Sequence, residues 1–412
     1  MELNRRDFLK VGVTGAGAAA FMPAILRRGL GSLRAETVHA APVDNGRILV
    51  VVQMSGGNDG LNTVIPIADQ AYYDNRVGIS IAASDALQLN PTTGLNPNLS
   101  KLKGLWDTGN LAIVEGVGYP NQNYSHFVST DIWQYADPTL KQREGWVGRY
   151  FDTLASAQTA PFLGLAVGST QPESYYSPFV STPAVQSVAQ YTFQSDPSAP
   201  TLTAARNKLM TDLYGSAPGA YGPLFNATLK TATASVQTLQ SAHQAYKAAV
   251  TYPSTGFAQA LLVVAETIAV NAGVKVYHVT IGGFDTHANE PTDQSRQLLQ
   301  MSEALGAFYA DLKAHGLDSN VLIMTWSEFG RRVKANASTG TDHGSAAPLF
   351  FIGTPVKGGL YGGRPSLTNL DNGNLKFTTD FRQPYATALT WIGASPAELV
   401  GPTYPALPLL KA

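Results

Sequence analysis

Residues 320–353 read NVLIMTWSEFGRRVKANASTGTDHGSAAPLFFIG and hold two short apolar runs joined by a polar loop. The first run, Val321 to Trp326, opens directly onto polar residues that include Glu328. The loop carries His343 between glycines, and a second run, Leu349 to Ile352, closes the stretch. In an open α/β sheet, ligands bind just outside the carboxyl ends of buried strands. The stretch therefore predicts a buried strand with part of a binding site at its end.

Two earlier segments have the same form. RILVVVQMSGGNDG, residues 47–60, carries Asp59 after its apolar run, and VKVYHVTIGGFDTH, residues 274–287, carries Asp285 and His287. Because the carboxyl ends of parallel strands meet at one edge of a sheet, the three segments would bring these side chains together. Carboxylate and imidazole groups suit a divalent metal. The sequence thus predicts one metal-dependent or hydrolytic centre, with candidate ligands Asp59, Asp285, His287, Glu328 and His343.

Each segment also has an interpretation that involves no ligand. The letters Asn-Asp-Gly around Asp59 are typical of a turn that needs a positive φ. Asp285 can cap a helix, with His287 incidental beside it, whereas residues two apart in an extended segment lie on one face and can share an ion. Asp342 and His343 are neighbours whose side chains diverge in an extended loop, so one can be a ligand and the other its outer partner. Both can equally belong to a polar surface loop.

The segment PNQNYSHFVSTDIW, residues 120–133, places Ser125 and His126 where a loop enters a helix. A helix N-terminus stabilises an anion or an ionised hydroxyl, so Ser125 is a candidate nucleophile for phosphoryl or sulfuryl transfer. Serine is also a good N-cap, which explains the same residue without catalysis. His126 is a further site candidate. Arg331 or Arg332 could clamp an oxyanion in bidentate fashion, or both could lie solvated at the surface.

Alternating strand and helix patterns predict an α/β fold: three layers with a mostly parallel sheet between helices. Strands are expected near 46–54, 111–118, 162–167, 274–281, 320–326 and 349–353, and helices between them. Residues 171–272 contain an irregular stretch and three helical segments, and we interpret them as an insertion. The prediction is a single domain over residues 41–412.

The N-terminus has the features of an export signal. Arg5 and Arg6 precede a weakly apolar, Gly/Ala-rich stretch that is too short and small-residued for a membrane span. Val38-His39-Ala40 fits a cleavage site. We therefore expect residues 1–40 to be a Tat signal peptide, with the Tat translocase as a transient partner, a periplasmic or secreted mature protein, and no stable transmembrane segment after cleavage. A basic amphipathic helix is the alternative.

Composition excludes several classes of function. Without residues 1–40 the chain has 22 basic and 26 acidic residues, a net charge of −4 and no basic stripe, so no nucleic acid is expected as a partner. The chain has no cysteine, which excludes thiol chemistry, thiolate metal sites and a cysteine-derived formylglycine.

The motifs together resemble a known family. RILVVVQMSGGNDGLNTVIP, NYSHFVSTDIW, GGFDTH, TWSEFGRR, GTDHGSAAPLFFIG and VKGGLYGG occur in this order, as in the secreted family labelled domain of unknown function 1501. That family resembles the alkaline phosphatase and sulfatase superfamily. The resemblance implies an alkaline-phosphatase-like fold with a metal site at the strand ends.

The resemblance also implies roles for particular residues. It matches Asp59 to the superfamily's first-strand aspartate, Ser125 to its nucleophile, and Asp285 with His287 to its Asp/His metal pair. His343 would be the late histidine. Glu328 and Phe329 stand where an Asp-His pair is expected; phenylalanine cannot bind metal, so one site is better supported than two. The spacing from Asp285 to His287 is shorter than usual in phosphatases, and no sulfatase Cys/Ser-x-Pro-x-Arg motif is present.

We therefore predict an exported metal-dependent hydrolase of phosphate or sulfate esters, acting on a small-molecule or polymer substrate. Zn, Mn, Ca and Mg are the candidate metals. The alternative is a non-catalytic, phosphatase-like binding or assembly protein of the cell envelope, which the phenylalanine at 329 favours. A carbohydrate-processing protein that uses the same cleft is a third hypothesis.

Overall fold

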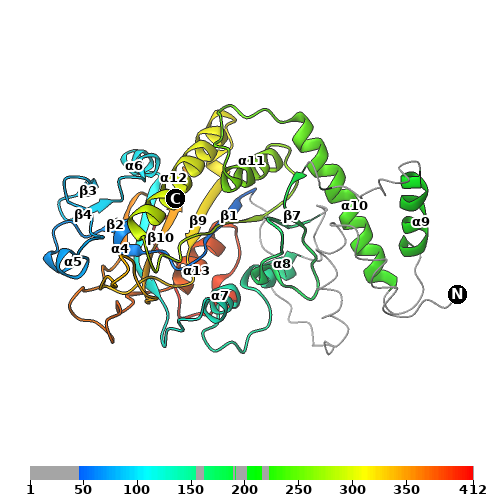
Figure 1. Cartoon of the computed structure of the whole chain (residues 1–412). Coiled ribbons are helices and arrows are strands. Elements are labelled where there is room, and N and C mark those ends of the chain that lie inside the picture. The colour runs from blue at the N-terminus through cyan, green and yellow to red at the C-terminus, as the bar shows by residue number, and fades with distance from the viewer. Residues whose placement is uncertain (1–45, 155–161, 189–190, 192–201, 216–221, 412) are drawn as a thin grey trace.

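A computed structural model describes residues 46–411 except 155–161, 189–190, 192–201 and 216–221 (Figure 1). The predicted signal peptide, residues 1–40, lies outside the described residues. None of the described helices is long and apolar enough to cross a membrane.

A nine-stranded sheet forms the centre of the molecule. Its strand order is β11-β5-β10-β9-β1-β8-β6-β7, and β12 pairs with β5. The strands are β1 (Ile48–Met54), β5 (Leu111–Gly118), β6 (Gly164–Val167), β7 (Ala184–Val185), β8 (Val276–Ile281), β9 (Val321–Trp326), β10 (Ala347–Ile352), β11 (Gly359–Gly362) and β12 (Thr379–Asp380). In this sheet β10 runs antiparallel to both its neighbours, and the other pairings are parallel. The predicted α/β class with a mostly parallel sheet is confirmed.

Helices cover both faces of the sheet (Figure 1). Val50 and Val52 of β1 belong to the core shared with α6 (Ser100–Asp107), α11 (Gly256–Ala269) and α12 (Glu290–Ala314). Leu49 and Val51, which alternate with them, belong to the core shared with α7 (His126–Tyr135), α8 (Trp146–Leu154), α13 (Arg382–Trp391) and α14 (Pro396–Leu399). Because successive side chains of a strand point to opposite faces, a near-continuous apolar run is what a strand buried on both sides requires. The sheet therefore lies between two layers of helices, as predicted.

A second, three-stranded antiparallel sheet, β2-β4-β3, was not predicted from the sequence. It consists of β2 (Val64–Ile65), β3 (Leu87–Asn90) and β4 (Thr93–Leu95), and lies beside α4 (Gly60–Thr63) and α5 (Gln70–Asn75). Strands of two to four residues are too short to show an alternating pattern, so the sequence carried little signal for them. Two single-turn 3₁₀ helices, η2 (Glu173–Tyr175) and η5 (Asp318–Asn320), complete the described elements.

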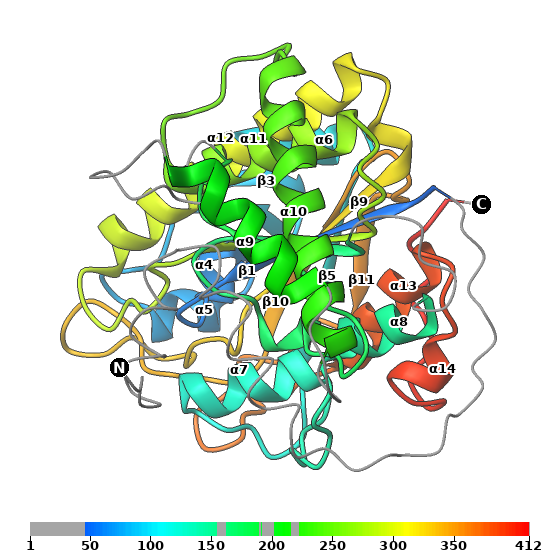
Figure 2. The same cartoon turned by 90° about the vertical axis from the view of Figure 1, so that its right-hand side faces the viewer.

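The region interpreted as an insertion contains α9 (Thr203–Gly215) and α10 (Gly222–Ala245), which lie next to each other and in front of the sheet in Figure 2. Leu239 of α10 is buried in the core on the α11 side. Just after α10, the Tyr246 hydroxyl donates to the buried Asp311 carboxylate at 2.7 Å. These contacts attach the helical segment to the body of the protein. The predicted domain limits at 41–412 stay a prediction.

Candidate metal centre

Three loops meet at the carboxyl ends of the adjacent strands β8, β1 and β9. Gly56, after β1, has a φ of +122°, and a Cβ there would collide with the backbone of Phe284 and Asp285 after β8. Gly57 has a φ of +76°, and a Cβ there would collide with the Phe329 ring after β9. Glycine is thus required in the first loop both by its backbone conformation and by the close approach of the other two.

His126, Asp285 and His343 form a group that could hold a metal ion: one ligand atom from each lies within 4.8 Å of the others. His126 Nε2 lies 3.5 Å from Asp285 Oδ2. His343 Nε2 lies 3.2 Å from Asp285 Oδ1. His126 comes from the start of α7, Asp285 follows β8, and His343 lies in the loop between β9 and β10. Residues more than 200 positions apart thus converge at one edge of the sheet.

The Nδ1 atoms of His126 and His343 each lie within hydrogen-bond distance of an acceptor. The acceptor is a carboxylate for His126 and a backbone carbonyl for His343. His126 Nδ1 lies 2.8 Å from Glu328 Oε1, and His343 Nδ1 lies 2.8 Å from the carbonyl oxygen of Tyr124. These contacts place the donating N–H on Nδ1, so in the neutral tautomer the Nε2 lone pair faces the group. His126 Nε2 is buried and has no hydrogen-bond partner among the described residues. A histidine whose second nitrogen donates to a carboxylate or carbonyl is the usual arrangement of a metal ligand.

His287 adds a third imidazole at the edge of the group. Its Nε2 lies 2.9 Å from His343 Nε2 and 3.2 Å from Asp285 Oδ1. Its Nδ1 lies 3.6 Å from a carboxylate oxygen of Asp342, which is more than half exposed. Lone pairs and a carboxylate oxygen facing one another at these distances repel unless a proton or a cation lies between them. Imidazole nitrogens together with a carboxylate are the donor types that a divalent metal takes, so the residues of this group fit such an ion.

The surrounding charges act on these groups in opposite directions. The hydrogen bond that His126 donates to Glu328 raises the pKa of His126 despite its partial burial. Partial burial lowers the pKa of His343, although its hydrogen bond to Tyr124 acts the other way. Burial by itself would raise the pKa of Asp285, but the adjacent Arg331 guanidinium holds it below its usual value. Asp285 is therefore ionised and His343 neutral near pH 7, as metal ligands must be, whereas the raised pKa of His126 means that a bound cation would have to displace a proton there.

Glu328 lies behind His126 rather than in the group. Its side chain is buried, and Oε1 also accepts from the Gly56 backbone N–H at 2.8 Å. The neighbouring Phe329 ring is buried against the imidazoles of His126 and His343, with ring centroids 4.9 and 4.6 Å apart. The phenylalanine that the resemblance marks as a departure thus packs against both imidazoles instead of binding.

Asp59 differs from its expected place. Its carboxylate caps α4, accepting from the Leu61 N–H at 3.2 Å, and forms a buried ion pair with Arg76. Arg76 also lies 3.5 Å from the buried carboxyl group of Glu290. The segment is structural, but as the start of a helix and not as the predicted turn: Asp59 has a φ of −70°, and neither Asn58 nor Gly60 has a positive φ. Asp59 is paired with an internal guanidinium and is not part of the group that could hold a metal.

Arg331 also differs from its expected role as an oxyanion clamp. Its guanidinium is buried and donates to carbonyl oxygens of all three loops, those of Gly56, Gly57, Phe284 and Thr341, and to Asp285 Oδ1 at 2.6 Å. These contacts use the Nε proton, both Nη2 protons and one of the two Nη1 protons, so the single proton left is too few for a bidentate clamp. Arg331 therefore joins the loops and orients Asp285. Arg332 is only partly buried and donates to the Asn372 carbonyl at 2.7 Å.

Ser125 occupies the N-cap position of α7 but makes no side-chain capping hydrogen bond. The residue is exposed, and its backbone N–H donates to Asn123 Oδ1 at 2.8 Å. It directly precedes His126 in the chain. Its predicted role as nucleophile stays a prediction.

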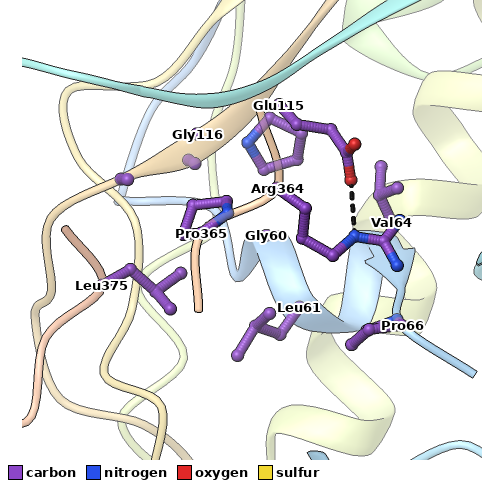
Figure 3. A pocket seen from close by; sticks show the side chains of 12 residues that line it. Gly60, Leu61, Val64, Pro66, Glu115, Gly116, Arg364, Pro365 and Leu375 are labelled. Carbon is purple, nitrogen blue, oxygen red and sulfur yellow. Dashed lines mark hydrogen bonds and ion pairs between the residues drawn. The ribbon is translucent and has the colours of Figure 1, made fainter. Parts of the chain in front are cut away.

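Two cavities lie apart from the histidines. One of about 30 Å³, mostly apolar, is lined in part by an ion pair in which Arg364 Nε donates to Glu115 Oε1 at 2.8 Å (Figure 3). Another of about 130 Å³ is lined in part by Asn62, Glu290 and Gln294. None of the predicted site residues lines either cavity.

Fold and site together define an α/β protein with a histidine–aspartate group, suited to a divalent metal, at the carboxyl edge of its sheet. The chain belongs to the DUF1501 family, a family of proteins of unknown function, whose model matches residues 109–399. No curated protein matches the sequence significantly.

Solved structures similar to this chain include members of the alkaline phosphatase and sulfatase superfamily. A protein in the alkaline phosphatase superfamily from Vibrio parahaemolyticus is 9% identical, with 91% of this chain and 75% of that chain covered and a TM-score of 0.37. The PsFucS1 sulfatase from Pseudoalteromonas sp. is 12% identical, with 92% and 71% covered and a TM-score of 0.38. The C-terminal periplasmic domain of EcEptC from Escherichia coli is 10% identical, with 90% and 91% covered and a TM-score of 0.38. At these TM-scores the likenesses carry no argument about the site.

Proposed function

We propose that this protein is an exported, metal-dependent hydrolase of phosphate or sulfate esters. The observation that carries the proposal is the convergence of His126 Nε2, His343 Nε2 and the Asp285 carboxylate, while the opposite ring nitrogens of both histidines are held by acceptors. Two nitrogens and one carboxylate favour Zn²⁺ or Mn²⁺ over Ca²⁺ or Mg²⁺, which prefer all-oxygen sites. A divalent ion at this place would polarise an ester oxygen.

The chain's own residues would supply the other functions. Asp285 stays ionised because Arg331 neutralises part of its charge, and Glu328 orients the His126 ring. Ser125 precedes His126 at the exposed N-terminus of α7 and is the candidate nucleophile: its Oγ would bond to phosphorus or sulfur as the bond to the alcohol oxygen breaks. The alcohol leaves with a proton, and water then releases the phosphate or sulfate from the serine.

Elemental analysis of the natively exported protein tests the proposal first, and about one Zn or Mn per chain is expected. Turnover of chromogenic phosphate and sulfate monoesters, with each candidate metal added, tests the activity. Asp285→Ala should abolish both metal binding and turnover. Asp107→Ala, an exposed carboxylate paired with Lys103 on α6, is the matched control and should change neither. A protein that binds no ion and turns over neither class of ester would refute the proposal.

The second candidate is a non-catalytic binding or assembly protein of the cell envelope. The buried Phe329 ring favours it, because this side chain occupies the flank of both imidazoles where an additional ligand would otherwise stand. Stoichiometric metal without turnover of any ester would support this candidate over the first.

A further inference from the structure

Glu290 is a buried carboxyl group that the proposed chemistry does not use. It is the first residue of α12, it is fully buried, and its carboxyl oxygens receive hydrogen bonds from several loops. Thr341 Oγ1 donates to Glu290 Oε2 at 2.6 Å, and Thr286 Oγ1 donates to the same oxygen at 3.4 Å. Asn62 Nδ2 donates to Oε1 at 3.0 Å.

The two threonines belong to the two loops that carry the candidate ligands. Thr286 lies between Asp285 and His287 in the loop after β8, and Thr341 precedes Asp342 and His343 in the loop after β9. One carboxyl oxygen of Glu290 thus joins both loops directly behind the ligand residues. The same pair of threonines is also linked through the backbone, because the Thr341 N–H donates to the Thr286 carbonyl at 3.1 Å.

The contacts continue from Thr341 to the ligand group itself. The Thr341 carbonyl accepts from Arg331 Nη1 at 3.0 Å, and Arg331 Nη2 holds Asp285 Oδ1 at 2.6 Å. His287 and His343, whose Nε2 atoms lie 2.9 Å apart, are the residues that any relative movement of the two loops would separate. Metal affinity depends steeply on such placement, since ligands must be held within a few tenths of an ångström.

We propose that Glu290 is a positioning residue: through the hydroxyl groups of Thr286 and Thr341 it sets the separation of the two loops, and so the spacing of Asp285, His287 and His343. The proposal rests on the metal site of the proposed function. The contribution of Glu290 is geometric and is transmitted by two neutral hydroxyl donors. The proposal therefore predicts that removing a hydroxyl without changing side-chain shape will disturb the ligand group.

The test compares Thr341→Val, which removes the hydroxyl and keeps the shape, with Thr341→Ser, which keeps the hydroxyl. Thr267→Val is the matched control, because Thr267 is equally buried and its hydroxyl donates to Val263 O at 2.6 Å within α11. Thr341→Val removes a donor to the buried Glu290 carboxyl group and should lower the free energy of unfolding. Thr267→Val should lower it less, because Val263 O keeps its partner in the helix. Thr341→Val alone should weaken Zn²⁺ or Mn²⁺ binding about tenfold, and Thr341→Ser should restore it.

A second readout needs no metal. The nuclear Overhauser contact between the His287 and His343 rings in the metal-free protein should weaken in Thr341→Val and persist in Thr341→Ser and Thr267→Val. If Thr341→Val matches Thr267→Val in both readouts, the positioning role is refuted. If the wild-type protein binds no ion, the proposed function fails, and the ring contact alone then supports or overturns the role of Glu290.

Discussion

The substitution Asp59→Asn tests whether Asp59 is a structural residue or a metal ligand. The carboxylate of Asp59 is 1% exposed and pairs with an Arg76 side chain that is 0% exposed. Asparagine keeps the shape and the ability to cap α4, so the change removes mainly the charge. Breaking one side of a buried ion pair leaves the other charge uncompensated, at a cost of about 3–5 kcal/mol.

Contacts that remain around Arg76 reduce this cost. Arg76 Nη1 still donates to the Val333 carbonyl at 3.1 Å, and Glu290 Oε1 lies 3.5 Å from Nη2. Burial, followed by the charge of Asp59, raises the pKa of Glu290 to about 9. Once residue 59 is neutral, that pKa falls and Glu290 can ionise to pair with Arg76. We therefore expect a loss of unfolding free energy near the lower limit, about 3 kcal/mol, and no change in metal affinity.

Urea unfolding and calorimetric titration with Zn²⁺ or Mn²⁺ measure the two quantities. Asp285→Asn is the reciprocal comparison: Asp285 is half exposed and belongs to the ligand group, so metal affinity should fall at least tenfold with a smaller loss of stability. If Asp59→Asn instead lowers metal affinity tenfold and leaves the urea midpoint unchanged, Asp59 is a ligand and the assignment made from its ion pair is wrong.

Three further predictions concern other parts of the chain. Ser125→Ala should abolish ester hydrolysis while changing stability by less than about 0.5 kcal/mol, because no capping bond is lost; full activity in Ser125→Asp would exclude the serine as nucleophile. Burial lowers the pKa of His278 from 6.5 to about 4. Between these pH values the unfolded protein binds a proton at His278 and the folded protein does not, so the free energy of unfolding falls by about 3 kcal/mol as the pH drops from 6.5 to 4. Urea unfolding at pH 7 and pH 4 should show a smaller pH difference for His278→Leu than for wild type, and an equal difference would contradict the assignment. Replacing Arg5 and Arg6 by lysine should leave unprocessed precursor in the cytoplasm; normal processing in the periplasm would reject Tat export.

The sheet and the loops at its carboxyl edge were predictable because their signals are local. β1, β8 and β9 are short apolar runs that end on glycine and polar residues, and parallel pairing then requires their ends to meet. Residue type and spacing, which the sequence shows, were enough to expect Asp285, His287 and His343 near one another, and their side chains do lie together. The same reasoning also included Asp59, and it did not include His126, which was a separate candidate at the start of a helix.

Only the tertiary structure decided which carboxylates are available for a metal. Asp59 and Asp285 both follow adjacent strands, but their partners differ. Arg76, directly after α5, forms a buried ion pair with Asp59. Arg331 binds Asp285 and also donates to carbonyl groups of the three loops. The buried carboxyl group of Glu290 likewise accepts hydrogen bonds from residues far away in the sequence. Thr341 is 51 positions from Glu290, and Asn62 is 228 positions from it. Such pairings leave no periodic pattern in the chain, because they arise where loops from separate strands pack together. The sequence therefore determined where the strands end and which residue types stand there, whereas packing determined which of those charges pair with each other and which face a common centre.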